Sequence, residues 1–225
     1  MTNPYEWLKL DAMKSPKTQS MEFDGPVGRI EVLLDTAPNP SKGIALIAHP
    51  QPLLGGSPRH KIPHMLAQKA KEMGWICLRP YFRGVGNTEG SYDHGTGETQ
   101  DLLAIIDTIR QHYPATRLAL IGFSFGAFVI SKVADELEKK GAPAQLTVLL
   151  SLPSGIVEAG RAYDTASVPA DSLVIHGEKD MQVPLGNVLT WASAFKHPIL
   201  VFPGADHFFK GHEKTLIKKI AETIL

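Results

Sequence analysis

The segment 122–126 (GFSFG) holds the residue with the clearest chemical potential in this 225-residue chain. It follows an apolar run at 118–121 and precedes a helical pattern, so it has the form G-x-S-x-G between a strand and a helix. A serine on such a tight turn is presented for attack on a carbonyl carbon. The helix N-terminus behind it favours developing negative charge. The pattern therefore indicates that Ser124 is a nucleophile.

A serine hydroxyl needs a general base that is itself oriented by a third group. With a G-x-S-x-G serine, the acid and then the histidine come after the serine along the chain. Asp180 follows the apolar run 173–175, and His207 follows the run 199–202. We predict that Asp180 is the orienting acid and His207 the base. Glu178 is the alternative acid, ranked lower because Asp180 lies deeper in its loop, next to an apolar segment.

Acyl transfer also needs two preorganised N–H donors for the oxyanion of the tetrahedral intermediate. One is expected from the backbone of Phe125, which follows the nucleophile. The second is expected from the loop after the apolar run 44–48. Pro50 and Pro52 in that loop carry no N–H. Gln51, held between these two prolines, is therefore the predicted second donor.

A small apolar pocket beside the serine is expected to hold the acyl group of a substrate. Its walls are expected from apolar residues in the loops and turns after the predicted strands. These residues are Leu53, Leu54, Tyr81, Phe123, Met181, Val183 and Phe208.

The elements that must position these residues alternate between strand and helix. The strand segments are continuous apolar runs, as expected for strands buried on both faces of a sheet. This alternation predicts a mostly parallel central sheet with helices on both faces, and chemistry at the carboxyl ends of its strands. The expected strands are 28–34, 44–48, 75–78, 118–121, 146–150, 173–175 and 199–202, and the expected helices are 62–73, 98–113, 125–140, a segment around Trp191, and 213–225.

Length and composition fit one domain of this class. The chain has 23 Lys and Arg against 23 Asp and Glu, so its formal charge is zero. Nothing in that balance directs it to nucleic acid or to an anionic membrane. Its single cysteine excludes an intramolecular disulfide and a multi-thiolate metal site. We expect a polar N-terminal arm over residues 1–18 and a single domain over residues 19–225, with the oligomeric state left open.

Targeting signals are not evident in the sequence. The N-terminus has no apolar segment of the signal-peptide kind. The longest nearly uncharged apolar stretch, residues 118–130, is interrupted by glycine and serine and is too short to span a bilayer. We therefore expect a cytoplasmic protein with no membrane partner.

Several other polar residues could suggest further sites. His60 and His64 have the spacing of a helical metal pair, but Pro63 and the lack of an H-E-x-x-H glutamate argue against zinc. The acids and histidine of segment 93–98 fit helix-entry capping better than a metal cluster. We expect neither a metal nor a cofactor.

Three residues close to the predicted strand ends are assigned structural roles. His49 and His176 each follow or end a buried strand, and we expect them to make structural hydrogen bonds. Arg83 is expected to pair with an acid of its own loop, with contact to substrate as the alternative.

Taken together, these residues resemble the α/β-hydrolase superfamily over about residues 20–225. Segment 49–52 (HPQP) looks like its H-G-x-P oxyanion segment, with proline in place of glycine. Segment 81–90 (YFRGVGNTEG) looks like its R-G-x-G-x-S segment, with Thr88 replacing the serine. Residues 93–98 are similar to the stretch after that segment in small lidless bacterial hydrolases of the dienelactone-hydrolase or carboxylesterase kind.

The resemblance implies the α/β-hydrolase fold and the same nucleophile, acid, base and oxyanion donors. Dienelactone hydrolases carry a cysteine nucleophile, whereas Ser124 occupies that position here and Cys77 lies in a predicted core strand. Dienelactone specificity is therefore disfavoured. Members with a shielded site usually insert a lid between the sixth and seventh strands. Here that interval, 153–171, has the length of a helix and two turns, so we expect no lid domain.

The combined prediction is a carboxylesterase-like serine hydrolase that cleaves small carboxylic esters through an acyl-enzyme. Its expected partner is a small-molecule acyl substrate. Thioesterases, lactonases, peptidases and acyltransferases use the same triad and remain open alternatives. A non-catalytic scaffold of the same fold is a further alternative, disfavoured because the serine, aspartate and histidine are all present.

Overall fold

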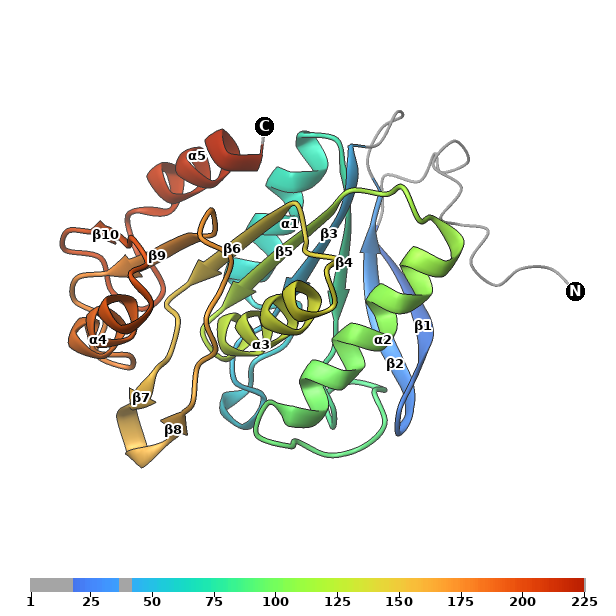
Figure 1. The fold of residues 1–225 in the computed structure, drawn as a ribbon, viewed down its shortest axis with the longest axis horizontal. Helices are drawn as coiled ribbons and strands as arrows, with labels where there is room; N and C mark the ends of the chain where they lie inside the picture. Colours follow the sequence, from blue (N-terminus) through green and yellow to red (C-terminus); the bar gives the residue numbers. More distant parts are fainter. Residues whose placement is uncertain (1–17, 37–41, 225) are drawn as a thin grey trace, which may run out of the picture.

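Eight strands of the computed structural model form one sheet, which runs the length of the molecule (Figure 1). The structure describes residues 18–36 and 42–224. The expected N-terminal arm therefore lies outside the described residues, except for Thr18. The strands are β1 (Gln19–Gly25), β2 (Gly28–Asp35), β3 (Gly43–Ala48), β4 (Trp75–Pro80), β5 (Leu118–Phe123), β6 (Leu146–Leu150), β9 (Leu173–Gly177) and β10 (Leu200–Phe202).

The strand order is β1-β2-β4-β3-β5-β6-β9-β10. From β4 to β10 all neighbouring strands are parallel, while β1 and β2 pair antiparallel with each other, and β2 pairs antiparallel with β4. Every residue of β3, β4 and β5 is buried, because helices cover both faces of the central strands. The predicted mostly parallel sheet is confirmed.

Strand β1 was not predicted from the sequence. Its seven residues contain one buried side chain, Phe23, and the others are exposed or half-buried. An edge strand with one solvated face lacks the continuous apolar run that marks a buried parallel strand. The register with β2, from Gln19 opposite Leu34 to Gly25 opposite Gly28, is set by the hairpin between them.

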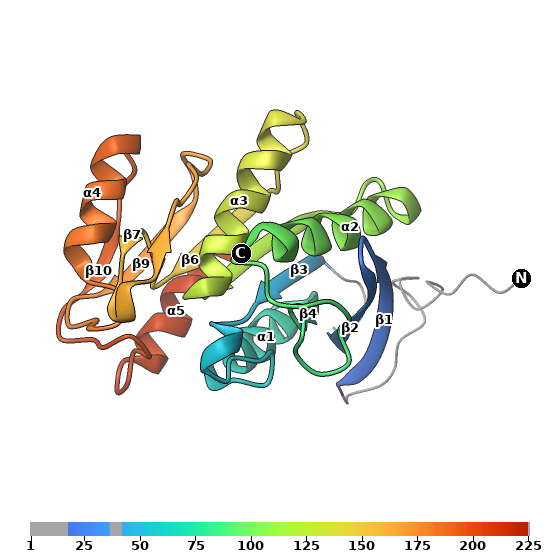
Figure 2. The same ribbon diagram turned by 90° about the horizontal axis from the view of Figure 1, so that it is seen from below.

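Within the described residues, five helices cover the sheet, three on one face and two on the other (Figure 2). One face carries α2 (Thr96–His112), α3 (Phe125–Lys139) and α4 (Leu185–Phe195). The opposite face carries α1 (Lys61–Glu72) and α5 (Glu213–Ile224). All five lie where the apolar spacing predicted helices. None of the helices over the described residues is both long and apolar enough to cross a bilayer.

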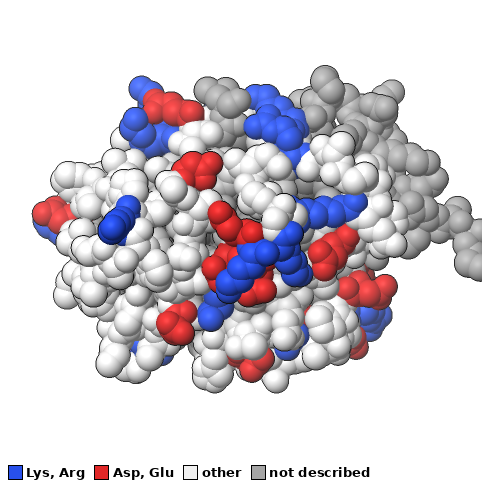
Figure 3. All heavy atoms as spheres, viewed as in Figure 1, with Lys and Arg blue, Asp and Glu red and all other residues white. Residues whose placement is uncertain are grey.

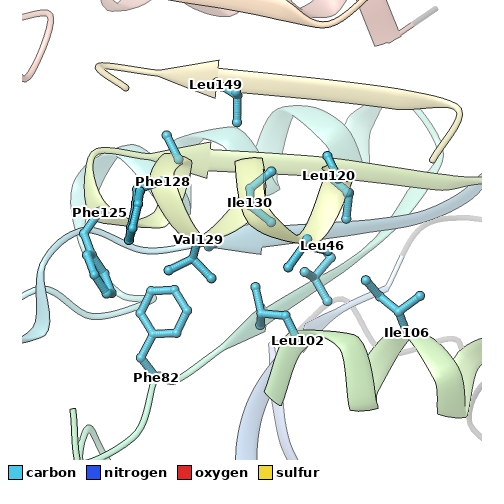
Figure 4. Packing of buried hydrophobic residues seen from close by; sticks show 14 of the residues in the cluster. Leu46, Phe82, Leu102, Ile106, Leu120, Phe125, Phe128, Val129, Ile130 and Leu149 are labelled. Atoms are coloured by element: carbon cyan, nitrogen blue, oxygen red, sulfur yellow. The ribbon is translucent and has the colours of Figure 1, made fainter. Parts of the chain in front are cut away.

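The core between α3 and the sheet extends to Phe125 at the start of the helix (Figure 4). Val129 and Ile130 of α3 lie over the sheet, where Leu46 of β3 and Leu120 of β5 are fully buried. Burial of each such side chain contributes roughly 1.5–3 kcal/mol. Phe125, at the start of the helix, packs edge-on against Phe82, with ring centroids 5.4 Å apart.

The segment between β6 and β9 is long enough for a helix and two turns, but it forms a short hairpin. Strands β7 (Gly155–Ile156) and β8 (Ala162–Tyr163) pair antiparallel, with a 3-10 turn, η3 (Glu158–Gly160), between them. This β7–β8 hairpin projects at the lower left of Figure 1. Nothing else is inserted between the two strands, so the described residues hold no lid domain here.

Charged side chains of both signs are interspersed on the face that carries α2 and α3 (Figure 3). On α3, Lys139 lies 2.6 Å from Asp135 and 3.3 Å from Glu136. Positive charge is thus neutralised locally, and the described residues of this face present no patch of a single sign.

The turn from β5 into α3 passes very close to the end of β3. A Cβ atom added to Gly126 would lie 2.4 Å from the carbonyl oxygen of Ala48, and one added to Gly122 would lie 2.5 Å from the carbonyl oxygen of Gly126. Both distances are far below van der Waals contact, and the closely packed backbone atoms of the core cannot move away to relieve the overlap. Glycine is therefore a steric requirement at these two positions.

We expect Gly126→Ala to lower the free energy of unfolding by roughly 1–3 kcal/mol, because the added methyl group overpacks the crossing of α3 and β3. Gly186→Ala in α4 is the matched control, since its Cβ would meet no atom of the described residues within 4 Å. That variant should be as stable as wild type or slightly more so. Urea unfolding of the three proteins measures the difference. Equal stability of Gly126→Ala and wild type would contradict the steric account.

Candidate active site

Ser124 occupies the sharp turn between β5 and α3. Its backbone has φ 55° and ψ −124°, a positive-φ conformation that costs a non-glycine residue of order 1–3 kcal/mol. The turn is held from both sides. The N–H of Ser124 donates to the carbonyl of Leu150 on β6 at 2.9 Å, and its own carbonyl accepts from Ala127 and Phe128 of α3. The strained turn places the hydroxyl at the helix N-terminus, where developing negative charge is stabilised.

His207 joins the hydroxyl of Ser124 to the carboxylate of Asp180. Its Nε2 lies 3.0 Å from Ser124 Oγ, and its Nδ1 lies 2.8 Å from Asp180 Oδ2. Because a carboxylate only accepts, we assign the imidazole proton to Nδ1, which leaves the Nε2 lone pair facing the serine. The three residues thus form the hydrogen-bonded series that the sequence predicted, and an imidazole so placed could remove the serine proton.

Asp180 is held in place by its own loop. Its Oδ1 accepts from the N–H groups of Gln182 at 3.0 Å and Val183 at 2.8 Å. Burial by itself would raise the pKa of this carboxyl. The hydrogen bond and charge of His207, with the Val183 N–H, outweigh burial and hold the pKa below its usual range. Asp180 is therefore ionised at neutral pH.

Glu178, the alternative acid, lies elsewhere. Its side chain is exposed, and Oε2 accepts from the backbone N–H of Gly204 at 2.7 Å. It therefore braces the loop after β10 and does not reach the Nδ1 atom of His207, which Asp180 occupies.

Two backbone N–H groups are available next to Ser124. Phe125 is the first residue of α3, so its N–H lacks an intrahelical acceptor. Among the described residues, neither this group nor the N–H of Gln51 donates a hydrogen bond. The carbonyl of Gln51 accepts from Gly56 at 2.9 Å, which fixes its peptide plane. Both predicted donors are thus free to meet an oxyanion.

The side chain of Gln51 is also fixed. Its Nε2 donates to the hydroxyl oxygens of Tyr92 and Tyr163, each at 3.2 Å. This contact ties the loop after β3 to strand β8 of the hairpin. Three segments far apart in the sequence therefore meet at this one amide group.

His49 and His176 make the structural hydrogen bonds expected of them. His49 Nδ1 lies 2.7 Å from the carbonyl of Pro50, so it is the donor, and Nε2 accepts from the Phe82 N–H at 3.0 Å. His176 Nε2 donates to the carbonyl of Val183 at 2.9 Å. Burial lowers the pKa of both histidines, that of His49 from 6.5 to about 3. Both imidazoles are therefore neutral supports of the loops that carry the site.

A small pocket of about 70 Å³ opens beside Ser124 and His207. Of the residues expected to form it, Leu54 and Phe208 are part of the lining. The complete lining is Pro50, Gln51, Leu54, Gly56, His60, Ser124, Arg161, Gln182, His207 and Phe208.

The other five expected pocket residues are outside this lining. Leu53 and Met181 are 67% and 83% exposed, so they face solvent. Phe123 is fully buried, and its ring packs against that of His207 with the centroids 5.2 Å apart. The Tyr81 hydroxyl accepts from Arg59 Nε at 2.8 Å. Val183 is buried.

Three polar residues in the lining were not expected as site residues. The spacing of His60 in the sequence suggests only a metal ligand, whereas in the structure its ring lies 5.6 Å from that of Phe208. Burial and the nearby His207 lower the pKa of His60. Gln182 and Arg161 come from loops with no recognisable motif, and no sequence signal marks them.

Arg83 pairs more closely with an acid of α2 than with the acid of its own loop. Its guanidinium binds Asp101 of α2 through Nε at 2.7 Å and Nη2 at 2.9 Å, while Asp93 of the loop is 4.0 Å away. The expected acid of the loop is therefore present, but it is the more distant of the two partners of Arg83. A helix places Asp101 one turn past Glu98, whose carboxylate caps the helix by accepting from the Gly95 N–H.

Comparison with known proteins places the chain among hydrolases. A family model described as serine hydrolase (FSH1) matches residues 60–215. The uncharacterized protein RP471 of Rickettsia prowazekii is 30% identical over 211 residues, which cover 90% of this chain and 87% of that protein.

Solved structures agree with this family match. The crystal structure of XC6422 from Xanthomonas campestris, a serine hydrolase without a lid, has a TM-score of 0.79 and 31% identity, covering 93% of this chain and 94% of that one. A serine hydrolase homologue from Coxiella burnetii has a TM-score of 0.78 and 29% identity, covering 92% and 97%. The predicted α/β-hydrolase fold without a lid is confirmed.

The buried state of His49 predicts part of the pH dependence of stability. Its pKa falls from 6.5 in the unfolded chain to about 3 in the fold, so the unfolded state binds the extra proton between these values. As the pH is lowered below 6.5, the free energy of unfolding should therefore decrease. This residue accounts for up to about 1.4 kcal/mol per pH unit. His49→Asn keeps a donor near Pro50 but cannot titrate. Urea unfolding at pH 7 and pH 5 should show a smaller loss for His49→Asn than for wild type. An equal loss would contradict the assignment.

Proposed function

The chain belongs to the FSH1 family of serine hydrolases, and on this premise we propose that it hydrolyses small carboxylic esters through an acyl-enzyme formed on Ser124. The observation that carries the proposal is the hydrogen-bonded series from Asp180 through His207 to Ser124 Oγ. The series ends at a pocket that Gln51 also lines, and among the described residues the backbone N–H groups of Gln51 and Phe125 donate no hydrogen bond. The proposal thus assigns a specific atom to the nucleophile, the base, the orienting acid and each oxyanion donor.

In the proposed first half-reaction, Ser124 Oγ attacks the ester carbonyl carbon while His207 Nε2 takes its proton. The carboxylate of Asp180 stabilises the imidazolium and keeps Nδ1 protonated. The N–H groups of Gln51 and Phe125 stabilise the carbonyl oxygen as it becomes negative. The C–O bond to the leaving alcohol then breaks, and His207 returns its proton to the alcohol.

In the second half-reaction a water molecule attacks the acyl-enzyme. His207 Nε2 accepts a proton from the water, and the same two N–H groups hold the new oxyanion. The C–O bond to Ser124 breaks, the serine regains its proton from His207, and the carboxylic acid leaves. Each full cycle consumes one ester and one water and yields one acid and one alcohol.

The pocket supports a short acyl chain. About 70 Å³ is far below the roughly 300–1,000 Å³ of sites that enclose drug-sized ligands. Three apolar side chains, those of Pro50, Leu54 and Phe208, line it. The remainder of a substrate would extend over the open edge of the sheet, since the described residues insert only the β7–β8 hairpin there.

Replacing the nucleophile tests the reaction directly. We expect Ser124→Ala to lower kcat for p-nitrophenyl acetate by several orders of magnitude and to abolish labelling by a fluorophosphonate probe. The matched control is Ser193→Ala, which removes an exposed hydroxyl from α4 and should leave both readouts unchanged. If Ser124→Ala were as active as wild type, the nucleophile would be misassigned. Lack of labelling of wild type would favour a non-catalytic scaffold.

The size of the pocket predicts a preference for short acyl groups. Across p-nitrophenyl esters, kcat/KM should be highest between acetate and butyrate and should decline for longer linear chains. The cause is the limited enclosed volume beside Ser124. Initial rates of p-nitrophenol release over the series measure this preference. A kcat/KM that increases steadily up to long chains would show that the acyl group binds elsewhere.

A further inference from the structure

Arg161 is the permanently charged residue in the pocket lining. The other lining residues are apolar or uncharged polar side chains, together with His60 and His207. No carboxylate of the described residues is part of the lining, and Asp180 lies behind His207 with its side chain buried. A substrate that enters the pocket therefore meets one fixed positive charge close to Ser124, with no negative charge on the described lining.

The guanidinium of Arg161 has spare binding capacity. Among the described residues, its single hydrogen bond runs from Nε to the carbonyl of Glu158 at 3.1 Å. The Glu158 carboxylate is 4.0 Å from Nη2, and its side chain is 57% exposed, so the ion pair is long and screened by solvent. Both terminal nitrogens thus remain available to a ligand, and arginine presents them in the geometry that binds a carboxylate at two points.

The backbone around Arg161 is firmly positioned. Its carbonyl accepts from the Val157 N–H at 2.8 Å, which closes the β7–β8 hairpin. Asn187 of α4 holds the hairpin by donating to the carbonyls of Ser154 and Ile156. Two residues beyond Arg161, the Tyr163 hydroxyl meets the Gln51 side chain. The hairpin therefore sets Arg161 at a constant place relative to the expected oxyanion donor.

We propose that Arg161 is a specificity-determining residue that selects esters carrying a carboxylate group, an inference that rests on the proposed ester hydrolysis. The carboxylate takes no part in bond making or breaking. It pairs with the guanidinium while the ester carbonyl lies at Ser124, and the enclosed volume requires the two groups to be separated by a short linker. The carboxylate belongs either to the acyl part or to the alcohol part of the substrate.

Two matched pairs of substrates separate these cases. Monomethyl glutarate and methyl pentanoate have acyl chains of equal length and differ by a terminal carboxylate. The pair 4-acetoxybenzoate and 4-acetoxybenzamide places the charge on the alcohol side. We expect wild type to prefer the charged member of one pair by roughly 10–100-fold in kcat/KM, the range for a hydrogen bond to a charged group.

Arg161→Gln should remove this preference, mainly by raising KM for the charged ester, because the contact is equally strong in the ground state and the transition state. Arg161→Lys should retain part of it. The control Lys214→Gln removes an equal charge from α5, outside the lining, and should keep the full preference. A circular dichroism spectrum and a urea unfolding midpoint equal to those of wild type will show that Arg161→Gln is folded.

Two results would overturn the inference while leaving ester hydrolysis in place. One is a wild-type enzyme without preference in either pair, and the other is an Arg161→Gln variant that slows the charged and neutral members equally. Failure of wild type to hydrolyse any of the four esters or to react with the fluorophosphonate would overturn the proposed function, and the inference with it.

Discussion

The contact between the start of α3 and the end of β3 leaves no space for a side chain at Gly126, and the geometry of the site depends on it. The contact places Ser124 beside the loop after β3. Hydrogen bonds then connect this turn to the ends of the neighbouring strands. The N–H of Ser124 donates to the carbonyl of Leu150. Ser151, which follows Leu150, donates through Oγ to the carbonyl of His207 at 3.2 Å. The positions of Ser124 and His207 are thus coupled through Leu150 and Ser151 at the end of β6.

Four histidines around the site differ in role because they differ in surroundings. His207 has a carboxylate on one nitrogen and a hydroxyl on the other, which is the arrangement for proton transfer. His49 and His176 have backbone partners and are fully buried, so desolvation keeps them neutral. His60 lines the pocket, where burial and His207 lower its pKa. Counting histidines in a sequence therefore says little until the partner of each nitrogen is known.

Much of the architecture could be predicted from local patterns. Continuous apolar runs mark the central strands because burial on both faces leaves no room for polar side chains. The G-x-S-x-G segment predicted the turn at Ser124, because neighbouring backbone atoms leave no space for a side chain at its two glycines. Asp180 and His207 could be found because parallel strands bring their carboxyl ends to one edge. Strand β1 escaped the same reasoning, because it is half-exposed and its one buried side chain is Phe23.

The sequence by itself thus determined the alternation of the buried strands and the helices along the chain, the serine turn and the residue types at the strand ends. Only the tertiary structure decided between Asp180 and Glu178, which are two residues apart but point to His207 and Gly204. It also decided that Arg161 lines the pocket. The physical reason is that periodicity records which residues are buried within one element. The direction of a loop side chain depends on hydrogen bonds to segments that are distant in the sequence, and these exist only once the sheet has brought those segments together.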